Sequence, residues 1–421
     1  MSALLPSPKT LDDVVRGGMC SGCGVCESIA GRDSVEMALT SEGRERPRVK
    51  RPLDAATEAR VLAACPGVSV TGPAPEAGTD VHPVWGPVRD VRRTWAADPA
   101  VRHRAAAGGT LTALAQHLLD TGEVDTVLHV RASASQPMCT AAQVSHTPGE
   151  ALSGAQSRYG PAAPLTELHR LLDEGARIAL VAKPCDISAV RNLARSDPRI
   201  ERQVPYMLTL FCGGVPTLET AARIARHAGI EPDEVSVFRW RGEGWPGPTH
   251  VEARDGRAMD LTYEDVWYDA SAPWKYDIQF RCKVCPDAIG EVADISAPDG
   301  WVLEDGRRVL REHPGRNLTI ARTEAGERLL RAAVEAGALV AEPSSVEEID
   351  AMHFDHLPRK LGWPARLLAF AALRQPAVRV RGYRPLRMLL RLGPRRGASS
   401  FRGALRRVRR GDHREAAPPP R

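Results

Sequence analysis

RIALVAKPCDISAVRNLARS, residues 177–196, places an apolar run directly before a cysteine and a helical pattern. The run RIALVAK predicts a buried strand, and the residues from Pro184 onward predict a helix. The same alternation lies on both sides: residues 164–175 predict a helix, 206–211 a strand and 217–229 a helix. Strands that alternate with helices in this way predict an α/β fold with a mostly parallel sheet.

Other segments extend this core in both directions. A helix that begins at Gly108, Gly109 and Thr110 precedes a strand at 124–130. Beyond residue 233 the pattern changes to short antiparallel strands, expected in EVSVFRW, RRVLREH and HVEARDGRAMDLTY with its Asp-Gly turn. Residues 316–340 predict a return to helix.

Three domains are expected along the chain. Residues 1–75 form a small module built on metal ligands, and the stretch TGPAPEAGTD (71–80) links it to the core. Residues 76–340 form the α/β core with its antiparallel segment. Residues 341–421 form a helical, arginine-rich C-terminal tail.

Composition is that of an ordinary soluble protein, with 43% hydrophobic and 26% charged residues among 421. The longest apolar stretches are too short to span a bilayer and no signal peptide is recognised, so a cytoplasmic location is expected. No Walker A run, dinucleotide fingerprint, catalytic Ser/His/Asp arrangement or zinc-protease spacing is found, which makes a hydrolase a weak interpretation.

Charge is distributed unevenly. Fifteen arginines and two acids give the last 48 residues a net charge of +13, so the first 373 residues carry −8. The tail predicts one or two short amphipathic helices and a disordered end. It is either a solvated tail or a surface for an anionic partner or a peripheral membrane contact; no motif supports nucleic acid. Because the cysteine motifs end before residue 302, truncation after residue 373 is expected to leave the cofactor sites intact.

Cys20, Cys23 and Cys26 form the run CSGCGVC, and Cys65 follows directly before a proline. A C-x2-C-x2-C turn with intervening glycines lets three thiolates converge on one cluster, as in half of a bacterial ferredoxin. Cys65 is then free to complete the site. Structural zinc, which prefers two separated C-x2-C pairs, is the alternative.

Four further cysteines form a looser set. Cys185 and Cys212 each follow an apolar strand, so both are expected at the carboxyl edge of one sheet, where α/β ligand sites gather. A loop carrying Cys282 and Cys285 would complete four thiolates. Redox-active or simply buried thiols are the alternatives, and Cys139 is expected to be structural.

The glycines before the helix at Thr110 suggest a phosphate site. Exposed amides at a helix N-terminus, with glycines that allow close approach, favour an anion. An ordinary helix start is the alternative interpretation.

The chain resembles the beta-subunit family of coenzyme F420 hydrogenases and dehydrogenases. Six blocks carry the resemblance in the family order: residues 84–128, SRYGP (157–161), AKPCDISAVRNL (182–193), LFCGG (210–214), RWRGEGWPG (239–247) and QFRCKVCPDAIGEVADISAPDGW (279–301). The resemblance implies FAD and iron–sulfur clusters, with electrons passing between a partner and a two-electron carrier. That carrier is expected to be the deazaflavin coenzyme F420.

Site residues follow from the resemblance. It implies two four-iron clusters, one held by Cys20, Cys23, Cys26 and Cys65 and one by Cys185, Cys212, Cys282 and Cys285. It also implies a flavin site lined by Gly108, Gly109, Thr110, Ser157 and Tyr159, with Arg241, Gly244 and Trp245 near the ring or the substrate. A loop packed against the core is the alternative for Arg241 and Trp245.

Several points stay open at this stage. Ala105–Ala107 stand where the family often has serines, so a hydroxyl contact to the flavin is missing there. No catalytic acid or base is expected, and Lys183 and Asp186 are candidates only for tuning the cluster. The alternatives to a coenzyme F420 enzyme are a ferredoxin-dependent reductase of a biosynthetic intermediate and a zinc-stabilised, non-enzymatic binding protein. The expected partners are a ferredoxin or another oxidoreductase subunit.

Overall fold

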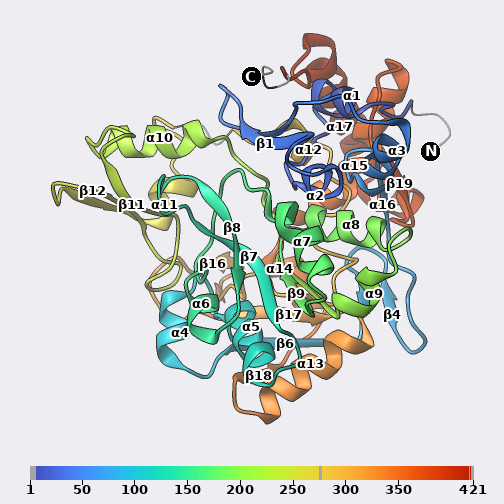
Figure 1. The fold of residues 1–421 in the computed structure, drawn as a ribbon. Helices are drawn as coiled ribbons and strands as arrows, with labels where there is room; N and C mark the ends of the chain where they lie inside the picture. Colours follow the sequence, from blue (N-terminus) through green and yellow to red (C-terminus); the bar gives the residue numbers. More distant parts are fainter. Residues whose placement is uncertain (1–5, 275–276, 417, 419–421) are drawn as a thin grey trace.

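The computed structural model describes residues 6–274, 277–416 and 418, and an eight-stranded sheet lies at its centre (Figure 1). In spatial order the strands are β18 (Leu339–Pro343), β6 (Asp90–Ala96), β17 (Asn317–Ala321), β14 (Ile295–Ser296), β10 (Tyr206–Thr209), β9 (Ile178–Val181), β7 (Thr126–Ala132) and β8 (Thr140–Ser145). Only β14, β10, β9 and β7 pair in parallel, and the strands beyond them on both sides pair antiparallel. The α/β class is confirmed, with parallel pairing confined to the centre of a mixed sheet.

Helices cover both faces of the sheet. On one face, α5 (Thr110–Asp120) and α13 (Glu324–Glu335) pack through Leu114, Leu118 and Leu329. On the other face lie α7 (Leu168–Asp173), which follows a 3-10 turn at Pro164–Glu167, and α8 (Pro184–Leu193). Successive residues of β9 alternate between the two cores, because strand side chains point to opposite faces. The result is a three-layer arrangement.

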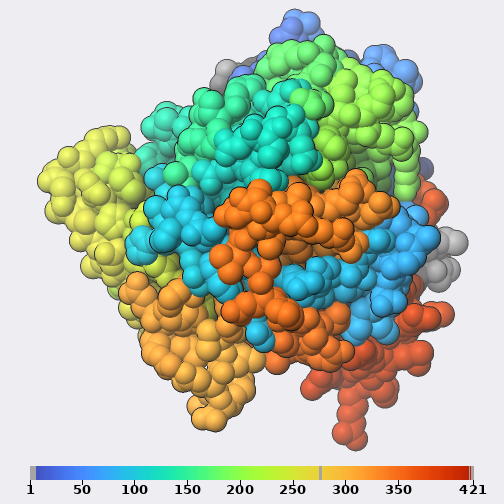
Figure 2. Space-filling model, turned by 90° about the horizontal axis from the view of Figure 1, so that it is seen from below, coloured from blue at the N-terminus to red at the C-terminus, as the bar shows by residue number. Residues whose placement is uncertain are grey.

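A second, antiparallel unit projects from this body, at the left of Figures 1 and 2. It contains β11 (Val235–Arg239), β12 (Thr249–Ala253) and β13 (Ala258–Leu261), packed beside α10 (Leu218–His227) and α11 (Tyr263–Trp267). A short hairpin, β15 (Leu303–Glu304) with β16 (Arg307–Arg308), follows. The antiparallel strands expected in EVSVFRW and HVEARDGRAMDLTY are confirmed, whereas in RRVLREH only Arg307–Arg308 form a strand. A helix was expected over residues 316–340, but only α13 is helical there. Strand β17 precedes it and strand β18 follows it.

The remaining helices and strands of the described residues lie outside the central sheet and its covering helices. They are α1 (Leu11–Arg16), α2 (Val25–Ala30), β1 (Val35–Leu39), β2 (Glu45–Val49), α3 (Ala55–Ala64), β3 (Ser69–Thr71), β4 (Asp80–His82), β5 (Gly86–Val88), α4 (Pro99–Arg104), α6 (Pro148–Leu152), α9 (Arg199–Gln203), α12 (Phe280–Lys283), α14 (Glu347–Met352), α15 (His356–Ala372), β19 (Arg379–Arg381), α16 (Pro385–Leu392) and α17 (Pro394–Arg410). None of the helices in the described part of the chain is long and apolar enough to cross a membrane.

The first and last parts of the chain share one core, seen at the top of Figure 1 where α1 and α3 lie beside α15 and α17. Val14, Cys20 and Cys65 pack with Trp363 and Phe370 in this core. Strand β3 pairs in parallel with β19, which joins the end of the N-terminal segment to the tail. The two termini therefore enclose the cysteine run together.

The tail departs from the expected solvated segment with a disordered end. Its two amphipathic helices are present as α16 and α17, but Tyr383 is fully buried and donates to Asp287 at 3.1 Å. Glu415 is buried against Arg46, and His413 packs on Phe280. The chain end beyond these residues lies partly outside the described range. Truncation after residue 373 would remove buried parts of the core, so the tail is not dispensable for the cysteine sites.

We therefore expect Tyr383→Ala to lower the free energy of unfolding by about 3–5 kcal/mol, as for other buried aromatic rings. The substitution removes a fully buried side chain and leaves Asp287 without its phenol partner. Leu386→Ala is the matched control on the same segment, because Leu386 is 75% exposed, and it should change stability by less than about 0.5 kcal/mol. Denaturant unfolding of both variants checks this, and equal stability of the two would contradict the buried position of Tyr383.

Candidate functional site: two thiol quartets and an anion pocket

The N-terminal quartet comprises Cys20, Cys23, Cys26 and Cys65, all of them buried. Gly22 and Gly24 adopt left-handed backbone angles, φ 73° and 87°, which fold the run into a tight turn. The third cysteine lies in the first turn of α2, and Cys65 caps the end of α3. The four thiols influence one another's pKa, so the fold brings together the residues that the sequence grouped.

The core quartet comprises Cys185, Cys212, Cys282 and Cys285. Cys185 is the second residue of α8, which follows β9, and Cys212 follows the neighbouring strand β10, so both lie at the carboxyl edge of the sheet as expected. Cys282 lies in α12, and its thiol accepts a hydrogen bond from the Val215 amide at 3.4 Å. The pKa of Cys212 responds to both Cys282 and Cys285, which places the loop cysteines beside it.

The thiols of each quartet are spread more widely than the ligands of a single zinc ion. Four sulfurs on one zinc lie ~3.8 Å apart, since Zn–S is ~2.3 Å. Among the described residues, only His353, Asp355 and His356 form a group of three or more potential ligands within 4.8 Å of one another.

Burial determines the protonation of the thiols in the absence of a metal. Burial raises the pKa of Cys65 and of Cys212 to about 12, so as free thiols both keep their proton at neutral pH. Ligation to a cationic centre removes that proton and compensates for the burial. Cys139 is only partly buried, contacts Gln136 at 3.3 Å and is part of neither quartet.

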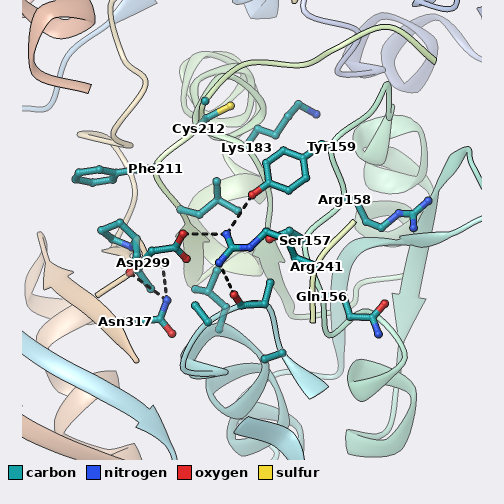
Figure 3. Close-up of a pocket in the computed structure, with 18 of the residues that line it drawn as sticks. Gln156, Ser157, Arg158, Tyr159, Lys183, Phe211, Cys212, Arg241, Asp299 and Asn317 are labelled. Atoms are coloured by element: carbon teal, nitrogen blue, oxygen red, sulfur yellow. Dashed lines mark hydrogen bonds and ion pairs between the residues drawn. The ribbon is translucent and has the colours of Figure 1, made fainter. Parts of the chain in front are cut away.

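A cavity of about 490 Å³ opens beside the core quartet (Figure 3). Cys212 and Lys183 form one wall, and the N-terminus of α5 with Gly109 and Thr110 forms another. Of the residues expected at the flavin site, Ser157, Tyr159 and Arg241 also line it. Gly109 has φ 77°, a conformation that glycine adopts without strain, and the first residues of α5, Thr110 to Thr112, line the cavity after it.

The cavity walls carry more positive than negative charge. Five basic side chains line it, against two carboxylates; they are Arg158, Lys183, Arg241, Arg308 and Arg359, against Asp299 and Asp355. Arg158 and Arg359 donate to main-chain carbonyls in the contacts that the structure shows. Because a carbonyl carries no net charge, these contacts do not neutralise the positive charges of Arg158 and Arg359, which can therefore attract an anion. Aromatic rings of Tyr159, Tyr263 and Trp267 complete a wall suited to a flat, anionic ligand.

Arg241 is the centre of this arrangement, as Figure 3 shows. It is 2% exposed and donates to Asp299 at 2.9 Å, to Tyr159 at 3.2 Å and to the Ala106 carbonyl at 2.7 Å. A buried guanidinium with its opposing carboxylate and carbonyl acceptors holds four chain segments in one position. Its role in the structure is to shape the cavity wall.

Three residues expected at the site do not line the cavity. A Cβ on Gly108 would lie 2.6 Å from the Thr94 carbonyl, so this glycine is required for close packing of strand and helix. Trp245 is 1% exposed and packs on Trp301 with ring centroids 4.7 Å apart. Gly244 has φ 109° and supports the same loop. These three residues lie behind the side chains that line the cavity.

Other lining residues were not identified from the sequence. Asn317 accepts from the Thr110 amide at 3.3 Å and donates to the Ala297 and Pro298 carbonyls, which fixes the start of α5. Asp299 lies within the block SAPDGW, and Arg158 within SRYGP, so the motifs indicated these segments but not the roles of the two side chains. Asn317, His353 and Arg359 carried no sequence signal.

Lys183 pairs with Asp186 at 2.8 Å, beside Cys185. Burial alone would lower the pKa of Lys183, but Asp186 and the nearby thiols outweigh burial and raise it. The lysine therefore stays charged next to the core quartet. At the opposite wall, Arg308 donates to Asp355 at 2.8 Å within the His353, Asp355 and His356 group, and its charge opposes binding of a cation there.

Comparisons with known proteins bear on the family of this chain. Two family models match: the coenzyme F420 hydrogenase/dehydrogenase beta subunit N-terminal model over residues 91–170 and the corresponding C-terminal model over 175–347. The beta subunit of a coenzyme F420-dependent formate dehydrogenase from Methanococcus maripaludis is 28% identical over 58% of this chain and 58% of its own length. A coenzyme F420-dependent sulfite reductase from Methanocaldococcus jannaschii is 24% identical over 58% of this chain and 36% of its own length.

This chain thus spans little more than half of the first relative and about a third of the second. Among solved structures, a chain of the F420-reducing nickel–iron hydrogenase complex from Methanosarcina barkeri is 20% identical. The TM-score is 0.49, over 63% of this chain and 85% of that one. The N-terminal quartet and the helices beyond residue 347 lie outside both family models.

Proposed function

This chain belongs to the coenzyme F420 hydrogenase/dehydrogenase beta-subunit family, and we propose that it is an iron–sulfur flavoprotein oxidoreductase that exchanges electrons with coenzyme F420. One juxtaposition carries the proposal: Cys212 of the core quartet lines the same cavity as Gly109 and Thr110 at the start of α5. A one-electron centre and a flavin-sized site would therefore be neighbours. The names of the relatives support coenzyme F420 as the hydride partner, and a cytoplasmic location is part of the proposal.

FAD would occupy the cavity. The amides of α5 and the charge of Arg158 or Arg359 would bind its phosphates, and the aromatic wall would contact its ring. Ala105–Ala107 line the cavity without hydroxyl groups, so main-chain groups must provide any polar contact there. A bound flavin transfers two electrons as hydride to an organic partner and single electrons to a cluster. The protein's own contribution is position, charge and exclusion of water.

The two quartets would each hold one four-iron cluster. We expect about eight iron and eight sulfide atoms per chain after anaerobic purification, because eight cysteines form two sets of four. Cys23→Ser and Cys282→Ser should each remove about half of the iron, whereas Cys139→Ser, the control, should remove none. Zinc without sulfide in the wild-type protein would contradict this assignment and favour the non-enzymatic binding protein.

A glycine pair tests the flavin site. In Gly109→Ala, the added Cβ makes the left-handed backbone at the start of α5 unfavourable by about 1–2 kcal/mol. Relief of this strain displaces the N-terminus of α5 at the cavity. We expect a lower flavin-to-protein ratio with unchanged iron. Gly122→Ala is the matched control, since Gly122 has φ 67° just beyond the other end of α5 with nothing within 4 Å, and it should retain flavin.

Reduction of the bound flavin tests the function itself. Reduced coenzyme F420 should bleach the oxidised flavin absorbance of wild-type protein under anaerobic conditions, and Gly122→Ala should behave as wild type. Bleaching by reduced ferredoxin but not by reduced coenzyme F420 would overturn the choice of hydride partner and favour a ferredoxin-dependent reductase. Absence of flavin from the protein would overturn the proposal as a whole.

The basic helices form the proposed docking surface for a redox partner protein, either a ferredoxin or another subunit. Arg395, Arg396 and Arg402 are exposed on α17, and Leu386 and Leu390 of α16 are 75% and 83% exposed. Arginines around exposed leucines suit an acidic protein surface with an apolar centre. The same side chains would also suit an anionic membrane surface.

Charge removal tests this surface without truncation. The triple variant Arg395→Gln, Arg396→Gln, Arg402→Gln should slow association with reduced ferredoxin at low salt, and the difference should shrink as salt rises, because screening acts within about 8 Å at 0.15 M. Arg328→Gln with Arg331→Gln, exposed on α13, is the control. If the triple variant and wild type associate with ferredoxin at equal rates at every salt concentration, and the variant no longer binds anionic vesicles, the surface is assigned to a membrane instead.

A further inference from the structure

One buried arginine lies between the two quartets. Arg46, on β2, is 1% exposed, and its Nε donates to Glu415 at 2.5 Å. One terminal nitrogen donates to the Glu45 carbonyl at 2.7 Å, and the other donates to the side chain of Gln279 at 3.0 Å. A Cβ on Gly22, in the middle of the CSGCGVC turn, would lie 3.6 Å from the guanidinium. The arginine thus adjoins the N-terminal quartet.

Gln279 connects this arginine to both quartets. Its side-chain amide donates to the Ser21 carbonyl at 3.3 Å, inside the cysteine turn. Its own carbonyl accepts from the Cys282 amide at 3.0 Å, at the start of α12. The side chain of Gln279 therefore contacts the turn of the N-terminal quartet, and its main chain contacts Cys282 of the core quartet. Gln279 is 3% exposed, so the connection is closed to water.

Arg46 is connected to both sites. Its guanidinium approaches Gly22 inside the cysteine turn, and its hydrogen bond to Gln279 leads to the residue whose carbonyl accepts from the Cys282 amide. Glu415 is shared with Arg44, at 2.6 Å, so it does not neutralise Arg46 alone.

We propose that Arg46 is a positioning residue that raises the reduction potential of both clusters and, through Gln279, joins the two sites into one electron path. Reduction adds one negative charge to a centre that thiolates already make negative. A positive charge buried nearby stabilises that reduced form, and the low dielectric of the interior strengthens the effect. This inference rests on the proposed function, because it requires clusters in both quartets.

The test substitutes each member of the Arg46–Glu415 ion pair in turn, in the full-length holoprotein. Arg46→Gln removes the positive charge, and Glu415→Gln removes the negative one, while both break the same 2.5 Å ion pair. In redox titrations followed by electron paramagnetic resonance, Arg46→Gln should lower both cluster midpoint potentials and Glu415→Gln should raise them. A purely structural role would move the potentials in the same direction in both variants, and that result would overturn the inference.

Two further variants keep the test decisive. Arg46→Lys retains the charge and should keep both potentials closer to wild type than Arg46→Gln does, even if iron content falls. Arg32→Gln removes an arginine of the same segment whose side chain is 75% exposed, and it should shift neither potential because solvent screens its charge. Fewer than two cluster signals in wild-type protein would reject the proposed function, whereas two signals unmoved by Arg46→Gln would reject only the role of Arg46.

Discussion

Convergence of eight thiols in two groups, one buried and one half-buried, is the constraint on which the rest of the structure depends. The ligands come from separate parts of the chain, from the glycine-containing turn at Cys20–Cys26 to the loop at Cys282–Cys285. The N-terminal group closes where the cysteine turn meets the end of α3, and the core group closes where two neighbouring strands meet the α12 loop. The sheet provides a rigid edge for Cys185 and Cys212, and the two ends of the chain pack together around the N-terminal thiols.

Enclosing those thiols requires buried charges that are paired. Glu291 lies in the loop after Cys285, fully enclosed, and is held by Lys360 of α15 and by Arg384 before α16. Beside the other quartet, the buried Arg46 is paired with Glu415. Removing one member of such a pair leaves an uncompensated charge in the interior, which is more costly than never burying the pair. The C-terminal segment is therefore part of the cysteine sites rather than an appendage.

The sequence predicted those parts of the site that local pattern determines. Strand and helix periodicity identified β9, α8 and β10. Cysteine spacing grouped the N-terminal four, and strand ends together with the family resemblance grouped the core four. It could not show that Tyr383 and Glu415 are buried, because an arginine-rich segment has the composition of a solvated tail. Nor could it place Trp245 behind the cavity wall, since a loop motif does not state which of its side chains face a ligand. Asn317 was missed because a single asparagine becomes informative only when its partners, here Thr110 and the Ala297 carbonyl, are placed around it.

The contacts define an order through the interior. The cavity adjoins the core quartet at Cys212, the core quartet adjoins Gln279 at Cys282, and Gln279 adjoins the N-terminal turn at Ser21. Each step is a direct contact or a hydrogen bond between described residues, and the last passes beside Arg46. The family models begin at residue 91, so this chain adds the N-terminal quartet to the cavity and core quartet that the models cover. Gln279, which is 3% exposed, contacts both quartets, and if each quartet holds a cluster as proposed, this residue is the enclosed connection between them.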